Sequence, residues 1–115
     1  MSNYTKIGKA VGARTELHDK LNLTGAEISV NTLEAGSCVP FVHAHKENEE
    51  IYFIISGKGK VTVDDEEITL SEGDWIKIAP AGKRQFFASS DSQISYICIQ
   101  VKAGSLGAYT ADDAL

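Results

Sequence analysis

The chain has 115 residues, of which 43% are hydrophobic, and 11 basic against 16 acidic side chains give a net charge of −5. This length is typical of one domain, and the acidic balance argues against a nucleic-acid-binding protein, which needs a basic surface. The longest purely apolar run, Ile51 to Ile55, is far shorter than the roughly 20 residues of a membrane-spanning helix. We therefore expect neither a nucleic acid nor a membrane as a partner.

The cysteines and the start of the chain indicate the compartment. Cys38 and Cys98 show no CxxC spacing, which favours two reduced thiols over a disulfide framework. The first residues contain no apolar signal-peptide core. We expect a cytoplasmic protein.

In chain order, residues 1–25 form a poorly readable N-terminal segment, in which the leucines at 17–23 allow a short helical turn or an edge strand. Residues 26–101 form the core of the single domain 1–115, and residues 102–115 form a polar tail. Within the core, β-branched and aromatic residues gather in short runs between Gly-rich and acidic turns. Strands are predicted at 28–33, 39–45, 50–56, 60–63, 68–70, 75–78, 85–88 and 94–101.

Two of these predicted strands have special boundaries. Pro40 limits the segment 39–45 to an edge or a bulge, and Gly57-Lys58-Gly59 is expected to end the strand that begins at Glu50. The number of short strands and the lack of helical periodicity predict an all-β sandwich or barrel.

The strongest candidates for a functional site are His43, His45 and Glu50. On a strand, residues at i and i+2 lie on one face, so both imidazoles would point the same way. Imidazole is the commonest protein ligand for mid-series divalent metals, and a carboxylate entering a barrel interior needs a partner. The alternative is a pair of exposed or hydrogen-bonded histidines without a metal, beside a solvated glutamate.

With its flanking glycines, this segment resembles the first motif of the cupin superfamily. That motif places HxH, a glutamate and a second glycine in the order seen at Gly36, His43, His45, Glu50 and Gly57. Glu49 competes for the acidic position, but six residues separate Glu50 from Gly57, as the motif requires. The resemblance covers about residues 26–101 and implies a small single-domain cupin, a jelly-roll barrel of the double-stranded β-helix type.

The second cupin motif is matched in part, by Gly73, Pro80 and Gly82. The resemblance places Gln85 at the fourth ligand position, where cupins usually have histidine, and Ser89 at the asparagine position. Gln85 could ligate the metal, hydrogen-bond a bound water or substrate, or mark a site that has lost its fourth ligand.

The resemblance implies a divalent transition metal (Fe, Mn, Ni, Co or Zn) held by His43, His45 and Glu50 with Gln85. Two histidines and one carboxylate with open positions form the facial triad of non-haem iron oxygenases. Glu50 could also be catalytic, as a proton acceptor when the metal holds it loosely.

Three residues are candidates for the substrate pocket. Phe41 and Tyr52 share strand parity with His43 and Glu50. Lys83 precedes Gln85, and strand alternation predicts that Lys83 shares the face of Gln85 while Arg84 faces away. An inward Lys83 would favour an anionic substrate.

The expected function is that of a small metal-dependent cupin acting on a small oxygen-bearing, possibly anionic substrate, as a dioxygenase or an isomerase or epimerase. The alternative is a non-catalytic module that binds a small molecule or a metal. Strands 51–55 and 94–101 are apolar on both faces. One face of each strand would lie outside the barrel and expose apolar side chains to water unless another subunit covers them. Small cupins also often form dimers, so we expect a homodimer.

Overall fold

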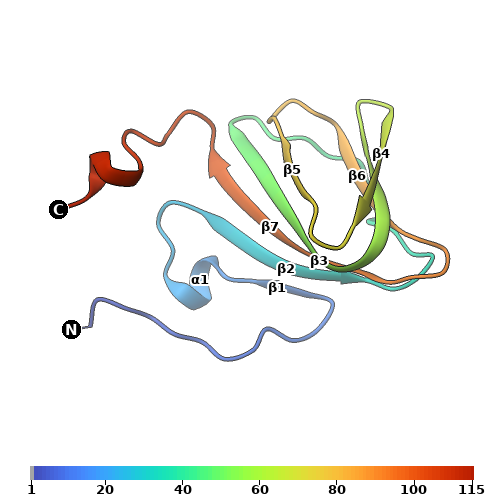
Figure 1. Ribbon diagram of the computed structural model, residues 1–115, viewed down its shortest axis with the longest axis horizontal. Coiled ribbons are helices and arrows are strands. Elements are labelled where there is room, and N and C mark those ends of the chain that lie inside the picture. Colours follow the sequence, from blue (N-terminus) through green and yellow to red (C-terminus); the bar gives the residue numbers. More distant parts are fainter. Residues whose placement is uncertain (1) are drawn as a thin grey trace.

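The computed structural model describes residues 2–115 and contains seven strands and two short helices in that range (Figure 1). The helices are α1 (His18–Leu21) and the 3-10 helix η1 (Thr110–Asp113). Within residues 2–115, neither helix has the length and apolar character needed to cross a lipid bilayer. The strands are β1 (Arg14–Glu16), β2 (Glu27–Leu33), β3 (Asn48–Val63), β4 (Glu66–Ser71), β5 (Trp75–Ile78), β6 (Arg84–Ala88) and β7 (Ile94–Lys102).

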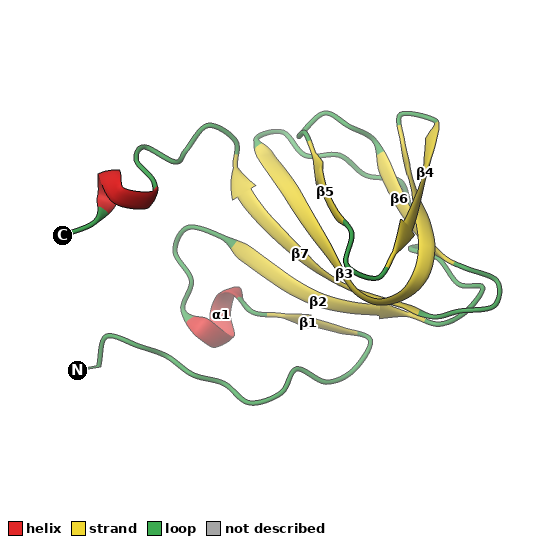
Figure 2. Ribbon diagram, in the orientation of Figure 1, coloured by secondary structure: helices red, strands yellow, loops and turns green. Residues whose placement is uncertain are grey.

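Strand β3 joins the two layers of the barrel. Its first half pairs antiparallel with β7 and β5, and β7 continues through β2 to β1. Its second half pairs with β4 and β6. Figure 2 shows the long strand curving from one layer into the other. The register against β7 shifts between Ile54 and Ser56, where the strand leaves the first layer.

Gly57 and Gly59 allow this crossing. Gly57 has a φ of +84°, and a Cβ there would lie 1.8 Å from the Gln93 carbonyl oxygen. A Cβ at Gly59 would lie 2.2 Å from the Phe87 carbonyl oxygen. The prediction that these glycines end the strand is therefore wrong: they carry β3 through a position where neighbouring backbone leaves no room for a side chain.

The core fills the space between the layers. On β3, Tyr52 and Ile54 point inward, and the aromatic ring of Tyr52 lies 4.4 Å from that of Phe86 on β6, between ring centroids. Tyr96 on β7 stacks on Phe86 at 4.8 Å. The alternation of buried and half-buried residues along β6 and β7 is the period of two expected of strands with one inner face.

The all-β prediction is confirmed, and so is the short helical turn near the N-terminus, with β1 just before it. The segment 39–45 does not form a regular strand. Two isolated antiparallel bridges join this part of the chain to β6, Cys38 with Phe87 and His43 with Arg84. Both chain ends lie outside the barrel body, on the left of the view in Figure 1.

Candidate metal centre

The two histidines lie on a segment that backbone hydrogen bonds fix to the first residue of β6 and to the loop before it. The His43 N–H donates to the Arg84 carbonyl oxygen (3.1 Å), and the Arg84 N–H donates to the His43 carbonyl oxygen (2.9 Å). The His45 N–H donates to the Pro80 carbonyl oxygen (2.8 Å). These bonds bring both imidazole rings to one side, with centroids 5.3 Å apart and the ring planes nearly perpendicular.

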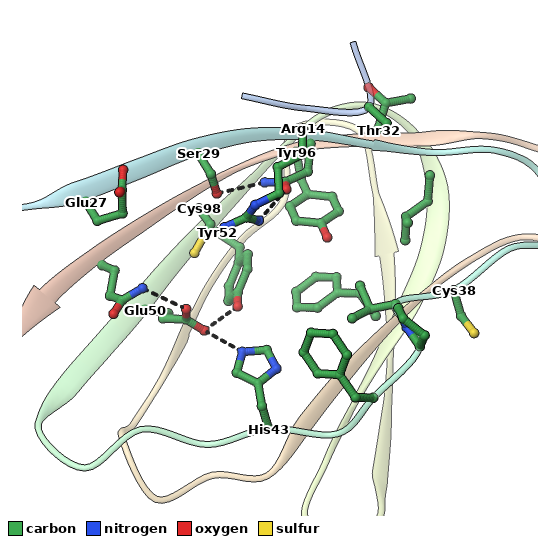
Figure 3. A pocket seen from close by; sticks show the side chains of 18 of the residues that line it. Arg14, Glu27, Ser29, Thr32, Cys38, His43, Glu50, Tyr52, Tyr96 and Cys98 are labelled. Atoms are coloured by element: carbon green, nitrogen blue, oxygen red, sulfur yellow. Dashed lines mark hydrogen bonds and ion pairs between the residues drawn. The ribbon is translucent and has the colours of Figure 1, made fainter. Parts of the chain in front are cut away.

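Glu50, on β3, completes a three-residue cluster. His45 Nε2 lies 3.1 Å from Glu50 Oε2, and His43 Nε2 lies 3.9 Å from Glu50 Oε1. One ligand atom from each of the three residues lies within 4.8 Å of the others. Figure 3 shows Glu50 and His43 converging on the same space. Two imidazoles and a carboxylate at this spacing fit a divalent transition metal.

The state of His43 also suits a ligand. Burial lowers the pKa of His43, despite the opposing charge of Glu50, so the ring is neutral at physiological pH. Neutral imidazole is the form that binds metals. Its Nδ1 atom is buried and finds no hydrogen-bond partner among residues 2–115, which leaves a polar atom of the cluster unpaired.

Four side chains of the described residues surround the Glu50 carboxylate. Oε1 accepts hydrogen bonds from the Tyr52 hydroxyl and from Arg84 Nη1, the latter at 2.7 Å. Oε2 faces His45 and, at 3.5 Å, Gln100 Nε2 on β7. Burial by itself would raise the pKa of Glu50, but the hydrogen bonds from Tyr52 and Arg84 and the Arg84 charge outweigh it and keep this pKa below its ordinary value. Glu50 is therefore an anion, better suited to a ligand than to a general base.

Arg84 is the residue that sequence reasoning placed on the wrong face. The prediction that Arg84 faces away is wrong: its side chain is 0% exposed and forms an ion pair with Glu50. The guanidinium also donates to the carbonyl oxygens of Ala79, Pro80 and Gly82. The inner face of β6 carries the residues at 84, 86 and 88, as its burial pattern shows.

Because Arg84 points inward, Gln85 and Lys83 occupy other places than the motif suggested. Gln85 Nε2 donates a 2.7 Å hydrogen bond to the Val39 carbonyl oxygen. Lys83 is exposed, and its N–H donates to Asp64 Oδ1 at the turn between β3 and β4. The structure thus brings His43, His45 and Glu50 together, whereas the Gln85 amide bonds to Val39 and Lys83 is exposed.

A cavity of about 510 Å³ opens beside the cluster and is mostly apolar. Phe41 and Tyr52 line it, as do all three residues of the cluster. Among residues 2–115, neither Gln85 nor Lys83 lines this cavity. Pockets of 300–1,000 Å³ with a few polar groups are the usual sites for small ligands.

Sequence reasoning missed three polar residues near the site: Arg84, Gln100 and Arg14. Parity with Phe86 and Ala88 on β6 was the available signal for Arg84, and parity with Cys98 on β7 was the signal for Gln100. Arg14 lies on β1, in the N-terminal segment whose sequence pattern is weak, and it reaches the cavity wall through pairing with β2.

Comparison with known proteins identifies the family. The protein-family model described as "Cupin domain" matches residues 29–100 of this chain. A crystal structure of a cupin protein from Bacteroides fragilis is 62% identical over 100% of this chain and 98% of that chain, with a TM-score of 0.97. An uncharacterized protein of Methanocaldococcus jannaschii is 44% identical over 39 residues, which are 34% of this chain and only 31% of that protein.

More distant structures share the fold alone. A cupin-superfamily sugar phosphate isomerase from Silicibacter pomeroyi is 20% identical over 78% of this chain and 60% of that chain, with a TM-score of 0.68. A predicted oxalate decarboxylase from Thermotoga maritima is 19% identical over 65% of this chain and 64% of that chain, with a TM-score of 0.61. From the family match and the full-length relative, this chain belongs to the cupin family.

Proposed function

We propose that the protein binds one divalent transition metal through His43, His45 and Glu50 and acts on a small oxygen-bearing substrate in the adjoining cavity. The observation that carries this proposal is the convergence of three ligand atoms within 4.8 Å of one another at the wall of the cavity. A metal held by these three residues alone would have further coordination positions for a substrate.

When bound, the metal supplies Lewis-acid polarisation of a substrate oxygen or activation of dioxygen. The protein supplies the rest. Arg84 and Tyr52 hydrogen-bond to Oε1 of Glu50 and keep the carboxylate ionised, the form that would hold the metal together with His43 and His45. The rings of Tyr52, Phe86 and Tyr96 exclude water from the neighbouring space and give a small substrate an apolar wall.

The reaction we propose is that of a dioxygenase or of an isomerase or epimerase. The isomerase from S. pomeroyi supports the second choice only through its fold. A second candidate, a non-catalytic binding module, is favoured by the Arg84–Glu50 ion pair, which balances the Glu50 charge without a metal. Oxygen consumption by the metal-loaded protein with a panel of enols and keto acids separates a dioxygenase from a binding module.

The metal proposal predicts different results for two alanine variants. We expect untagged protein treated with EDTA to bind one divalent ion in calorimetric titration. His43→Ala removes a ligand and lowers the affinity by more than about tenfold, since loss of a residue that merely supports a ligand already costs 10–100-fold. Gln85→Ala serves as the control and leaves the affinity within about twofold, because Gln85 bonds to Val39. Equal losses in both variants would restore the four-ligand assignment, and no binding by the parent protein would refute the metal site.

We also propose that the protein is a homodimer that buries the outer face of the β2–β7–β3 layer. This face presents two apolar rows across neighbouring strands, at registers set by β2–β7 and β7–β3 pairing: Ile28, Ile99 and Ile51, then Val30, Ile97 and Phe53. Trp75, 64% exposed, packs on Phe53 with ring centroids 4.4 Å apart. In the N-terminal segment, Tyr4 and Val11 are also exposed. A second copy offers the same apolar surface and segment, so we commit to it as the occupant.

Light scattering after size-exclusion chromatography tests this assembly. At micromolar concentration we expect twice the chain mass of 12.4 kDa. Ile99→Glu places a charge in the middle of the face and yields the monomer, whereas Thr69→Glu, on exposed β4, leaves the dimer intact. A monomeric parent protein, or a dimer that survives Ile99→Glu, contradicts the proposed interface.

A further inference from the structure

Two buried polar side chains interrupt the inner face of β2. Ser29 is 3% exposed and Asn31 is 6% exposed, and both line the cavity. Asn31 Nδ2 donates a 2.9 Å hydrogen bond to Ser29 Oγ. Burial of polar groups costs free energy, and their mutual hydrogen bond offsets only part of that cost. Their position on a cavity wall therefore points to a polar contact inside the cavity.

Arg14 extends this polar pair. Strand pairing places Arg14 opposite Asn31, and Arg14 Nη1 donates a 2.8 Å hydrogen bond to Asn31 Oδ1. The other contact of the guanidinium is a 3.8 Å ion pair from Nη2 to Glu16, between side chains that are both more than half exposed. Such pairs are weak. Because a guanidinium has five N–H donors, Arg14 is fixed by one of them and retains others for a ligand.

The charge of Arg14 acts inside the cavity. Among the cavity-lining residues of the described chain, 2–115, Arg14 is the only lysine or arginine. Burial raises the pKa of Cys98 to about 12 and that of Tyr96 to about 12, and on both groups the positive charge of Arg14 acts in the opposite direction. Both side chains line the same cavity as Arg14.

We propose that Arg14, oriented by Asn31, binds the carboxylate of a small organic acid whose other end reaches the metal centre. Figure 3 shows Arg14, Ser29 and Tyr96 on one side of the cavity and His43 on the other. The aromatic rings between these two sides favour a planar or apolar body, and the cavity volume of about 510 Å³ suits a molecule of that size. Only the second contact, at the metal, rests on the proposed function.

Arg14 thereby takes the role of binding the substrate's charge, which the sequence suggested for Lys83. Arginine is the better residue for this task, because its planar fork of N–H groups matches the two oxygens of a carboxylate. Asn31 holds one edge of that fork, which reduces the conformational freedom that a bound carboxylate would otherwise have to restrict.

The test compares benzoate with benzamide, an uncharged molecule of nearly the same shape. Each probe is titrated by calorimetry and by amide NMR into EDTA-treated protein, so the outcome does not depend on a metal. We expect benzoate to bind with a Kd of about 1 mM, about tenfold more tightly than benzamide, as one charge-assisted contact provides. The perturbed amide signals should include Ser29 and Asn31.

Three variants locate the preference. Arg14→Gln should bring the benzoate-to-benzamide affinity ratio to about one, and Arg14→Lys should keep part of the preference. Lys83→Gln makes the same change in net charge at an exposed position and should leave the ratio unchanged. Thermal unfolding of each variant is recorded in parallel, because Arg14 also ties β1 to β2.

The proposal is overturned if the parent protein shows no preference for benzoate, or if Arg14→Gln retains the preference while only its stability falls. It is also overturned if benzoate perturbs amides far from Ser29 and Asn31. A carboxylate preference together with no metal binding would refute the metal centre and leave the Arg14 site standing. The opposite pair of results would refute the Arg14 site alone.

Discussion

Arg84→Met is expected to lower the free energy of unfolding by about 3–5 kcal/mol, the cost of breaking a buried ion pair by removing one partner. The side chains of Arg84 and Glu50 are 0% and 4% exposed, so water cannot replace the lost contact. Methionine preserves the volume but leaves the Glu50 anion and three loop carbonyl groups without the guanidinium. Urea denaturation measures the loss, and Lys83→Met, at the exposed neighbouring position, should change stability by less than about 0.5 kcal/mol.

The pH dependence of this loss identifies its electrostatic part. The pKa of Glu50 in the folded protein lies below its ordinary value of 4.5. The stabilisation that ionised Glu50 provides is therefore present above pH 4.5 and is lost as the pH falls through the folded-state pKa. Below that pH Glu50 is protonated in both proteins, so the difference between the parent protein and Arg84→Met should narrow.

A double-mutant cycle completes this experiment. In Glu50→Gln with Arg84→Met, no buried charge remains unpaired, so the double variant should be more stable than the sum of the two single effects predicts. A cost of less than about 1 kcal/mol for Arg84→Met, with no change on acidification, would contradict the assigned role of the ion pair.

Arg84 also shows where sequence reasoning about the site was limited. HxH spacing and a glutamate at the start of an apolar strand located His43, His45 and Glu50, because each lies in a segment whose pattern is clear. The fourth position was taken from the motif spacing after Pro80 and Gly82, across a turn that does not itself set which face of the next strand a residue takes. A single position of offset on a strand reverses the face, so Gln85 was expected where Arg84 lies.

The hydrogen-bonded group of Arg14, Asn31 and Ser29 depends on contacts between strands, which no local sequence pattern predicts. The pairing of β1 with β2 sets Arg14 opposite Asn31, across 17 positions of sequence. The residues between these two strands form a short helix with an αL residue, Asn22, at its end, and this turn returns the chain to the sheet. Such pairings are decided by tertiary packing, which outweighs the weak propensities of the segment.

The fold was more accessible, since alternation in β2, β6 and β7 and the acidic turn at Asp64–Asp65 are local signals. The path of β3 could not be predicted from local signals. Two glycines between apolar runs are typical of a turn, and only the close approach of Gln93 and Phe87 shows that the strand continues. The neighbours that require glycine there lie about 30 positions further along the chain.

This distinction predicts unequal effects for two glycines that the family motif treats alike. Gly36 and Gly57 have φ values of +77° and +84°, so alanine at either position costs about 1–2 kcal/mol for the left-handed backbone. At Gly36 nothing lies within 4 Å of the added Cβ. At Gly57 the Cβ would meet the Gln93 carbonyl oxygen at 1.8 Å, and this oxygen belongs to backbone that the β3–β7 pairing holds in place.

We therefore expect Gly57→Ala to lower the free energy of unfolding by about 3–5 kcal/mol, the backbone term plus an overpacking cost of about 1–3 kcal/mol. Gly36→Ala is the matched control, with the backbone term alone. Urea denaturation gives both values, and hydrogen exchange at Gln93 and Ile94 shows whether the β3–β7 pairing opens at the crossing. Equal losses in the two variants would mean that β3 can shift away from Gln93 without leaving either layer. The two glycines would then serve only for their backbone angles.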